Sequence, residues 1–176
     1  MNELSPRRDA RAASQNKLFL VFSIGGQRFA LPATEVAEVL PRLALKPIAQ
    51  APHWVAGVFA HRGAVVPVID VSALAFAQPA AARTSTRLVL VHLRADAQRP
   101  DLLLGLILEQ ATDTLRCNLA DFQPYGLDNR EAPYLGPVRE DALGLLQWVQ
   151  VDDLLPEDVR ALLFPPEPGP AVEDLP

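Results

Sequence analysis

The chain has 176 residues, of which 49% are hydrophobic and 21% are charged, and its formal net charge is −5. This balance is typical of a folded domain with enough apolar mass for a core, and it disfavours non-specific nucleic-acid binding, which needs a basic face. The single cysteine, Cys117, excludes an intrachain disulfide and a zinc site built from thiolates, and it fits a reducing cytoplasm.

The two ends of the sequence predict disordered segments on either side of one folded domain. Residues 1–16 are polar and lack the apolar segment of a secretory signal, and residues 165–176 are rich in proline and acidic side chains. The domain is expected over residues 17–164. Because no run approaches the roughly 20 apolar residues that span a bilayer, we expect no direct membrane contact.

The first predicted elements form a β-hairpin and a further strand. Residues 18–32 contain two branched and aromatic runs around Gly25 and Gly26, a pair that favours a tight two-residue turn. Residues 33–41 predict one helical turn that leads into a strand, which stops near Pro41.

A second strand pair is predicted over residues 54–70, with His61, Arg62 and Gly63 at the joint between its two apolar runs. Gly63 suits a tight turn because it tolerates a positive φ angle. Such a turn would present Arg62 outward, and its planar guanidinium can pair with a carboxylate of this domain or of a partner. Asp70 stands at the N-cap position of a short helical segment.

The second half of the sequence follows a flexible connector and predicts a similar series of short strands. Five strand signals and a terminal helical segment follow, at residues 87–93, 102–109, 111–117, 134–140, 142–151 and 151–164. Many short strands with tight turns predict an all-β fold of small barrels or a sandwich. We expect two similar β-barrel subdomains joined near residues 76–86.

We find no set of residues that predicts catalysis or metal binding. The three histidines, His53, His61 and His92, have no H-E-x-x-H or H-x-H spacing, and neither a G-x-S-x-G elbow nor a P-loop occurs. Neighbouring carboxylates fall in turns, where they are hydrated, or at helix starts, where they interact favourably with the helix dipole. We therefore expect no catalytic, cofactor-binding or metal-binding residues.

Four segments between Phe19 and Leu155 are specific when their order and spacing are taken together. They are FLVFSIGGQRFALPATEVAEVL, IAQAPHWVAGVFAHRGAVVPVIDV, LLLGLILEQATDTL and YLGPVREDALGLLQWVQVDDLL. The second contains the pattern G-V-x-x-x-R-G-x-x-x-P-V-x-D. In these features the chain resembles the CheW-like domain family, the adaptors of bacterial chemosensory arrays.

The resemblance implies an all-β fold of two small five-stranded β-barrels packed side by side, with short helical turns, a short C-terminal helix and no catalysis. It implies an adaptor between the cytoplasmic tips of chemoreceptors (methyl-accepting chemotaxis proteins) and the regulatory domain of a CheA-type histidine kinase. That kinase carries its own CheW-like domain, and the two kinds alternate in rings. The resemblance also implies a cytoplasmic protein recruited to inner-membrane receptor arrays.

Partner contact is implied for the positions that match the family's motifs, which are Val36, Glu38, Gly57, His61, Arg62 and Gly63. The chain departs from the family just before the Arg-Gly pair, where Ala60 and His61 replace the usual Asn-Leu. This change removes hydrogen-bonding sites and an apolar contact, and it adds a group that can charge near neutral pH. It favours a dedicated, non-flagellar array, such as one that controls surface behaviour or a second messenger.

Two other classes of function stay open. A small β-barrel enzyme could use Arg62 and His61 as an oxyanion-binding and acid pair, although nothing supplies a nucleophile or a cofactor site. A small-barrel nucleic-acid binder is disfavoured by the acidic balance and by the lack of interleaved aromatic and basic residues. A gel shift with labelled single strands, and co-sedimentation with receptor-bearing membranes and kinase, discriminate between these classes.

Overall fold

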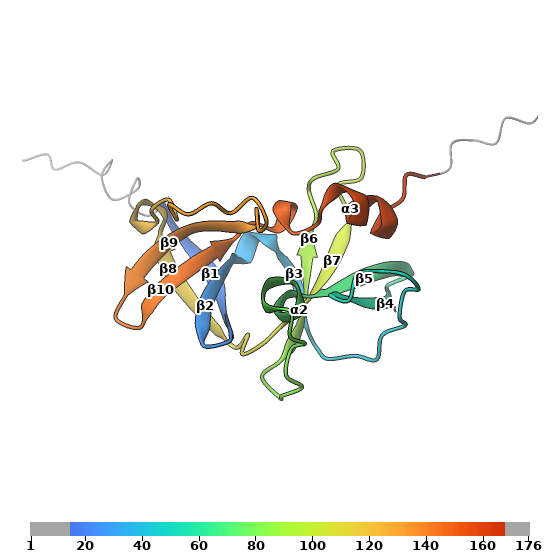
Figure 1. Ribbon diagram of the computed structural model, residues 1–176, viewed down its shortest axis with the longest axis horizontal. Helices are drawn as coiled ribbons and strands as arrows, with labels where there is room; N and C mark the ends of the chain where they lie inside the picture. The colour runs from blue at the N-terminus through green and yellow to red at the C-terminus, as the bar shows by residue number, and fades with distance from the viewer. Residues whose placement is uncertain (1–14, 168–176) are drawn as a thin grey trace, which may run out of the picture.

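The computed structural model describes residues 15–167, so most of the two ends that we expected to be disordered lie outside the described residues. The described part is built mainly from strands (Figure 1). The strands are β1 (Asn16–Ile24), β2 (Gln27–Pro32), β3 (Val36–Pro41), β4 (Val55–His61), β5 (Ala64–Asp70), β6 (Arg87–His92), β7 (Leu103–Leu108), β8 (Asp113–Asn118), β9 (Leu135–Asp141) and β10 (Gly144–Val149). The helical segments are η1 (Ala33–Glu35), α2 (Val71–Phe76), η2 (Leu119–Asp121), η3 (Val151–Asp153) and α3 (Glu157–Leu163).

The strands form two five-stranded sheets that lie side by side, which confirms the predicted fold class (Figure 1). Sheet A has the order β8-β1-β2-β10-β9, and sheet B has the order β3-β6-β7-β5-β4. In each sheet one central pair is parallel, β2 with β10 and β5 with β7, and the other pairs are antiparallel.

A backbone bridge brings the two edges of each sheet together. In sheet B, Lys46 follows the edge strand β3 and pairs with Val58 on the other edge strand, β4, through two hydrogen bonds of 2.9 Å. In sheet A, Gln123 follows β8 and pairs with Val138 on β9 at 2.7 and 2.9 Å. Closure removes the unpaired strand edges that an open sheet would expose.

The two halves of the chain are similar, as expected, but each half does not form its own barrel. Both halves run as a hairpin, a single strand, a second hairpin and a helical segment. Sheet A takes β1 and β2 from the first half and β8 to β10 from the second, while sheet B takes β3 to β5 and β6 to β7. Residues 76–86, where we expected the junction between subdomains, instead connect α2 to β6 within sheet B. The halves interleave because two strands that pair in parallel must be joined by a long connection, and the parallel partners β2 and β10 lie in different halves of the chain.

One apolar core joins the two sheets. Phe22 and Phe29 of sheet A stack with ring centroids 5.5 Å apart. Both belong to the same buried cluster as Val89 and Leu106 of sheet B and Leu154 beyond η3. Each large side chain buried in this way contributes about 1.5–3 kcal/mol. Because the core is shared, the two barrels are packed as one body.

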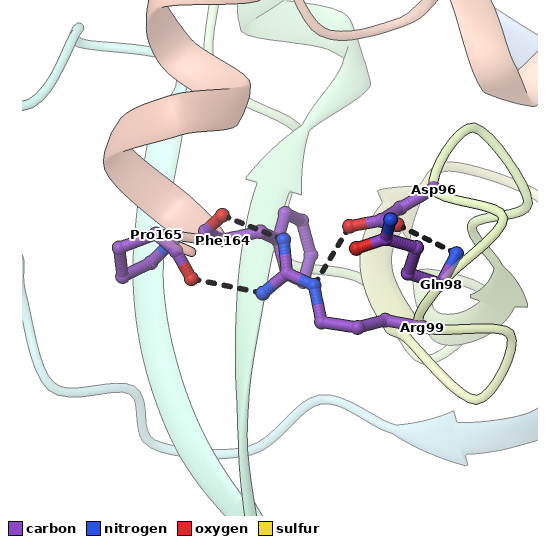
Figure 2. A network of polar contacts seen from close by, with 5 residues as sticks. All are labelled: Asp96, Gln98, Arg99, Phe164 and Pro165. Carbon is purple, nitrogen blue, oxygen red and sulfur yellow. Dashed lines mark hydrogen bonds and ion pairs between the residues drawn. The ribbon is translucent and has the colours of Figure 1, made fainter. Parts of the chain in front are cut away.

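Arg99, on the loop between β6 and β7, fastens the C-terminal end of α3 (Figure 2). Its guanidinium donates to the carbonyl oxygens of Phe164 at 3.0 Å and Pro165 at 2.8 Å. These carbonyls have no partner within the helix, so Arg99 satisfies them. Arg99 also donates to the Asp96 carboxylate at 2.7 Å, and this hydrogen bond lowers the pKa of Asp96. In the part of the chain described here, no helix has the length and hydropathy needed to cross a membrane.

Candidate functional site

The turn between β4 and β5 holds Arg62 in an unusual backbone conformation. His61 pairs with Ala64, which leaves Arg62 and Gly63 as the two turn residues, with φ angles of +48° and +80°. Two positive φ angles define the turn that matches the twist of a β-hairpin, and glycine or asparagine normally occupy both positions. An arginine there costs roughly 1–2 kcal/mol in local strain. The structure thus confirms a tight turn at Gly63 and places a strained Arg62 at its tip.

Three ionisable side chains, those of Glu38, His61 and Arg62, gather at this tip. One carboxylate oxygen of Glu38, Oε2, lies 3.1 Å from His61 Nε2 and 3.4 Å from Arg62 Nη2. The His61 side chain is 15% exposed and that of Glu38 is 31% exposed, whereas Arg62 is 78% exposed. The base of the cluster is therefore set into the protein surface, and the Arg62 guanidinium projects from it into solvent.

The closure of sheet B brings these residues together. Glu38 lies on β3 and His61 on β4, which are the two opposite edge strands of the sheet. The bridge between Lys46 and Val58 joins those edges. On β3, Glu38 shares the half-buried row with Val36 and Leu40, so its carboxylate faces the seam of the barrel. The carboxylate can be held there because the Arg62 guanidinium supplies an opposite charge and His61 Nε2 lies within hydrogen-bonding distance.

The other two residues that we expected at the site have different positions. Gly57 is buried on β4, and a side chain there would place its Cβ 2.4 Å from the Lys46 carbonyl oxygen. Its φ angle of +142° also disfavours other residues. Gly57 therefore permits the close approach of backbones that closes the barrel. Val36 is half-buried and packs against the main core.

Three apolar side chains on β3, on β5 and on the loop after β3 are exposed, and the sequence patterns did not single them out. Val39 on β3 is 46% exposed, Val65 on β5 is 71% exposed, and Leu43 in the following loop is 43% exposed. Val39 falls on the opposite face of β3 from Glu38, because side chains alternate along a strand. On β3 the usual alternation is reversed at two positions. Glu38 stands between the apolar Val36 and Leu40 in the half-buried row, and the apolar Val39 stands in the exposed row. This reversal is the sequence pattern that identifies the edge strand β3.

The hairpin of β9 and β10 occupies the equivalent place in sheet A. Its tip carries Leu143, which is 77% exposed, and Leu145, which is 58% exposed. Beside them Arg28 of β2 donates to Asp141 at the end of β9, at 2.7 Å. This hydrogen bond lowers the pKa of Asp141. A shallow cleft of about 320 Å³ lies between this tip and the β1–β2 turn.

Two other reactive side chains, Cys117 and Tyr134, are buried. Cys117 is buried in a small cluster with Phe19 and Leu146 in sheet A. Burial raises the pKa of Tyr134. Within residues 15–167, no group of three or more His, Cys, Asp or Glu side chains is placed to hold a metal ion.

The fold and the two hairpin tips define a domain whose prominent surface features are charged and apolar side chains on rigid turns, the kind of surface that binds other proteins. The family profile of the CheW-like domain matches residues 18–159, so the chain belongs to this family of chemotaxis adaptors.

Relatives with known names agree with this assignment. The chain is 31% identical over 105 residues to the chemotaxis protein CheW of Rhizobium meliloti (strain 1021), a match that covers 60% of this chain and 64% of the relative. It is 29% identical to Protein FrzA of Myxococcus xanthus, over 79% of this chain and 87% of FrzA. The solved structure of the scaffolding protein TtCheW from Thermoanaerobacter tengcongensis superposes with a TM-score of 0.71 at 16% identity, over 90% of this chain and 95% of TtCheW. That likeness concerns the fold.

Proposed function

We propose that this chain is a non-catalytic adaptor that couples chemoreceptor tips to the regulatory domain of a CheA-type histidine kinase. It acts in the cytoplasm at receptor arrays of the inner membrane, where other CheW-like domains join it in rings. The replacement of Asn-Leu by Ala60-His61 favours a dedicated, non-flagellar array. The observation that carries the proposal is the Arg62 guanidinium, projected from a strained turn whose base is fixed by Glu38 and His61.

The Arg62 tip has the physical features of an anchor for a protein partner. A guanidinium forms short, paired hydrogen bonds with a carboxylate, and these are stronger and more directional than those of an ammonium group. A rigid turn reduces the entropy lost when the partner binds. Val65, which pairs with Ala60 next to the turn, is an exposed apolar side chain near this charge and can supply surface that excludes water on binding.

An adaptor needs a second surface held at a fixed distance from the first. The β9–β10 tip, with Leu143 and Leu145, offers an apolar surface on the other barrel. Because one core joins the barrels, a partner on each tip would be kept in a constant relative orientation. An adaptor of this kind acts on the kinase through differential contact with its active and inactive states.

Two substitutions at Arg62 test the proposal. Arg62→Glu reverses the charge, and Arg62→Gly removes the guanidinium while relieving the strained φ angle. We expect both to weaken binding to the kinase regulatory domain or to receptor-bearing membranes by at least about tenfold, because a charged contact is lost at the interface. The thermal midpoint should stay near that of the wild type, and Arg62→Gly should raise it slightly. Titration calorimetry and co-sedimentation measure the binding.

Arg83→Glu is the matched control, since Arg83 is an exposed arginine on the connector. It makes the same change of charge away from the tip and should leave binding unchanged. If Arg62→Glu unfolds the protein while Arg62→Gly binds normally, Arg62 is structural and the site is wrong. If both variants fold and bind like the wild type, the Arg62 tip is not the docking surface.

A further inference from the structure

Two basic side chains share one oxygen atom at the Arg62 tip. His61 Nε2 and Arg62 Nη2 lie 3.1 and 3.4 Å from the same atom, Glu38 Oε2. The two donors differ in their surroundings, because His61 is 15% exposed and Arg62 is 78% exposed. The ring of Phe59 lies beside His61, with ring centroids 5.8 Å apart.

The charge on His61 determines how strongly Arg62 is held. With a neutral imidazole, Glu38 and Arg62 form a balanced pair, and the His61 N–H is a neutral donor. With a protonated imidazole, two positive charges face one carboxylate and repel each other. Electrostatic attraction is stronger where water is excluded, so the more buried His61 retains Glu38 and the solvated Arg62 is released.

Few other charged groups face His61 within the described residues. Glu38 is the charged residue of β3, and β5 places the uncharged Ala64 opposite His61. The loop between β3 and β4 carries Arg42, Lys46 and the exposed His53. Of these, Lys46 is held against β4 through its backbone. Imidazole is the side chain that ordinarily changes charge between about pH 5 and 8, so His61 is the group in this cluster that can switch.

We propose that His61 is a positioning residue whose protonation transfers Glu38 from Arg62 to itself and so presents Arg62 to a carboxylate on a partner surface. The release of Arg62 is a property of this chain alone. The consequence for binding rests on the proposed function.

The release is tested first on the full-length chain without a partner. The ¹⁵Nε resonance of Arg62 is followed by NMR from about pH 8.5 to about pH 5.5. In the wild type we expect it to move towards its position in Glu38→Gln, a variant that removes the carboxylate charge and serves as the reference for a released Arg62. In His61→Gln, which keeps a donor without a titrating charge, the resonance should stay constant. The same movement in His61→Gln, or none in the wild type, would overturn the proposal.

Binding is tested next with the CheA-type kinase regulatory domain over the same pH range. We expect the wild type to gain about threefold in affinity relative to His61→Gln as the pH falls, which is the scale of one exposed ion pair. His53→Gln is the matched control, because it removes an exposed histidine elsewhere and should keep the wild-type profile.

The two proposals fail in different ways. If Arg62→Gly abolishes binding but the wild type and His61→Gln have the same pH profile, the role of His61 is wrong and the docking surface stands. If Arg62→Gly binds normally, the docking surface is wrong, and the NMR titration still decides whether His61 releases Arg62.

Discussion

The β4–β5 and β9–β10 hairpins occupy equivalent places in the two barrels, but their tips have different chemistry. The first presents a charged cluster in which Arg62 is 78% exposed and shares its carboxylate partner with His61. The second presents two exposed leucines, and its ion pair, Arg28 with Asp141, is more buried, at 18% and 22% exposure. The same arrangement of strands thus supports an electrostatic tip on one barrel and an apolar tip on the other. The backbone geometry is a shared support, and the turn residues set the type of contact.

The largest expected difference between the hairpins lies at their buried glycines. In Gly57→Ala the new Cβ would lie 2.4 Å from the Lys46 carbonyl oxygen, at a φ angle of +142°. In Gly136→Ala it would lie 2.9 Å from the Trp148 carbonyl oxygen, without a positive φ angle. We expect Gly57→Ala to lower the free energy of unfolding by about 3 kcal/mol or more, and Gly136→Ala by about 1–2 kcal/mol. Urea unfolding measures both changes. Equal losses of unfolding free energy would show that the two barrels tolerate an added methyl group at their closure equally well.

A smaller effect should appear on acidification, and it should come from the sheet A tip. The hydrogen bond from Arg28 holds the pKa of Asp141 below its ordinary value of 3.8. A lowered pKa in the folded state stabilises the protein above pH 3.8, and this contribution is lost as the pH falls through the folded pKa. We expect Arg28→Gln to lower the free energy of unfolding by about 1–2 kcal/mol at neutral pH, and this deficit should disappear as the pH falls through the folded pKa of Asp141.

Urea titrations of the wild type and Arg28→Gln at a series of pH values measure the difference. Subtracting the two profiles cancels the contributions of Asp96 and Asp128, whose pKa values are also lowered, by hydrogen bonds from Arg99 and Arg130. A constant deficit at every pH would show that Arg28 acts by packing and not through Asp141.

The smallest effect on stability is expected at the exposed leucines. Leu143→Ser should change the free energy of unfolding by no more than about 0.5 kcal/mol, because the side chain is 77% exposed. Binding of the partner on the sheet A barrel should nevertheless weaken several-fold, since apolar anchors carry much of the energy of an interface. Leu162→Ser on α3, where the leucine is 48% exposed, is the matched control. Equal binding by both variants would remove Leu143 from the docking surface.

The sequence predicts the local elements well because their signals are local. Gly25 and Gly26 form the expected turn, at φ angles of +57° and +77°. Asp70 caps α2 as expected, and its side chain accepts a hydrogen bond from the Ala73 amide at 3.1 Å. The interleaving of the two halves could not be read in this way. It depends on parallel pairs such as Arg28 with Leu146, and hydrophobic patterning does not identify which distant strand is the partner.

The candidate site was predictable in part. The turn residues Arg62 and Gly63 stand out because they interrupt two apolar runs. The contact between His61 and Glu38 cannot be recognised in the sequence, because it forms across the seam where the two edge strands of sheet B meet. Gly57 is a different case, since the structure gives it a role in closing the barrel that the sequence pattern did not reveal.

The interleaved topology also constrains how the protein can be made. As the ribosome extends the chain, sheet B has all its strands once Leu108 has emerged, but β1 and β2 must wait for β8, β9 and β10. A hairpin of two strands is only marginally stable by itself, so β1 and β2 stay without their partner strands until β10 has emerged. A product that stopped in the connector would contain two incomplete barrels, and it would be a substrate for proteases and not a smaller working domain.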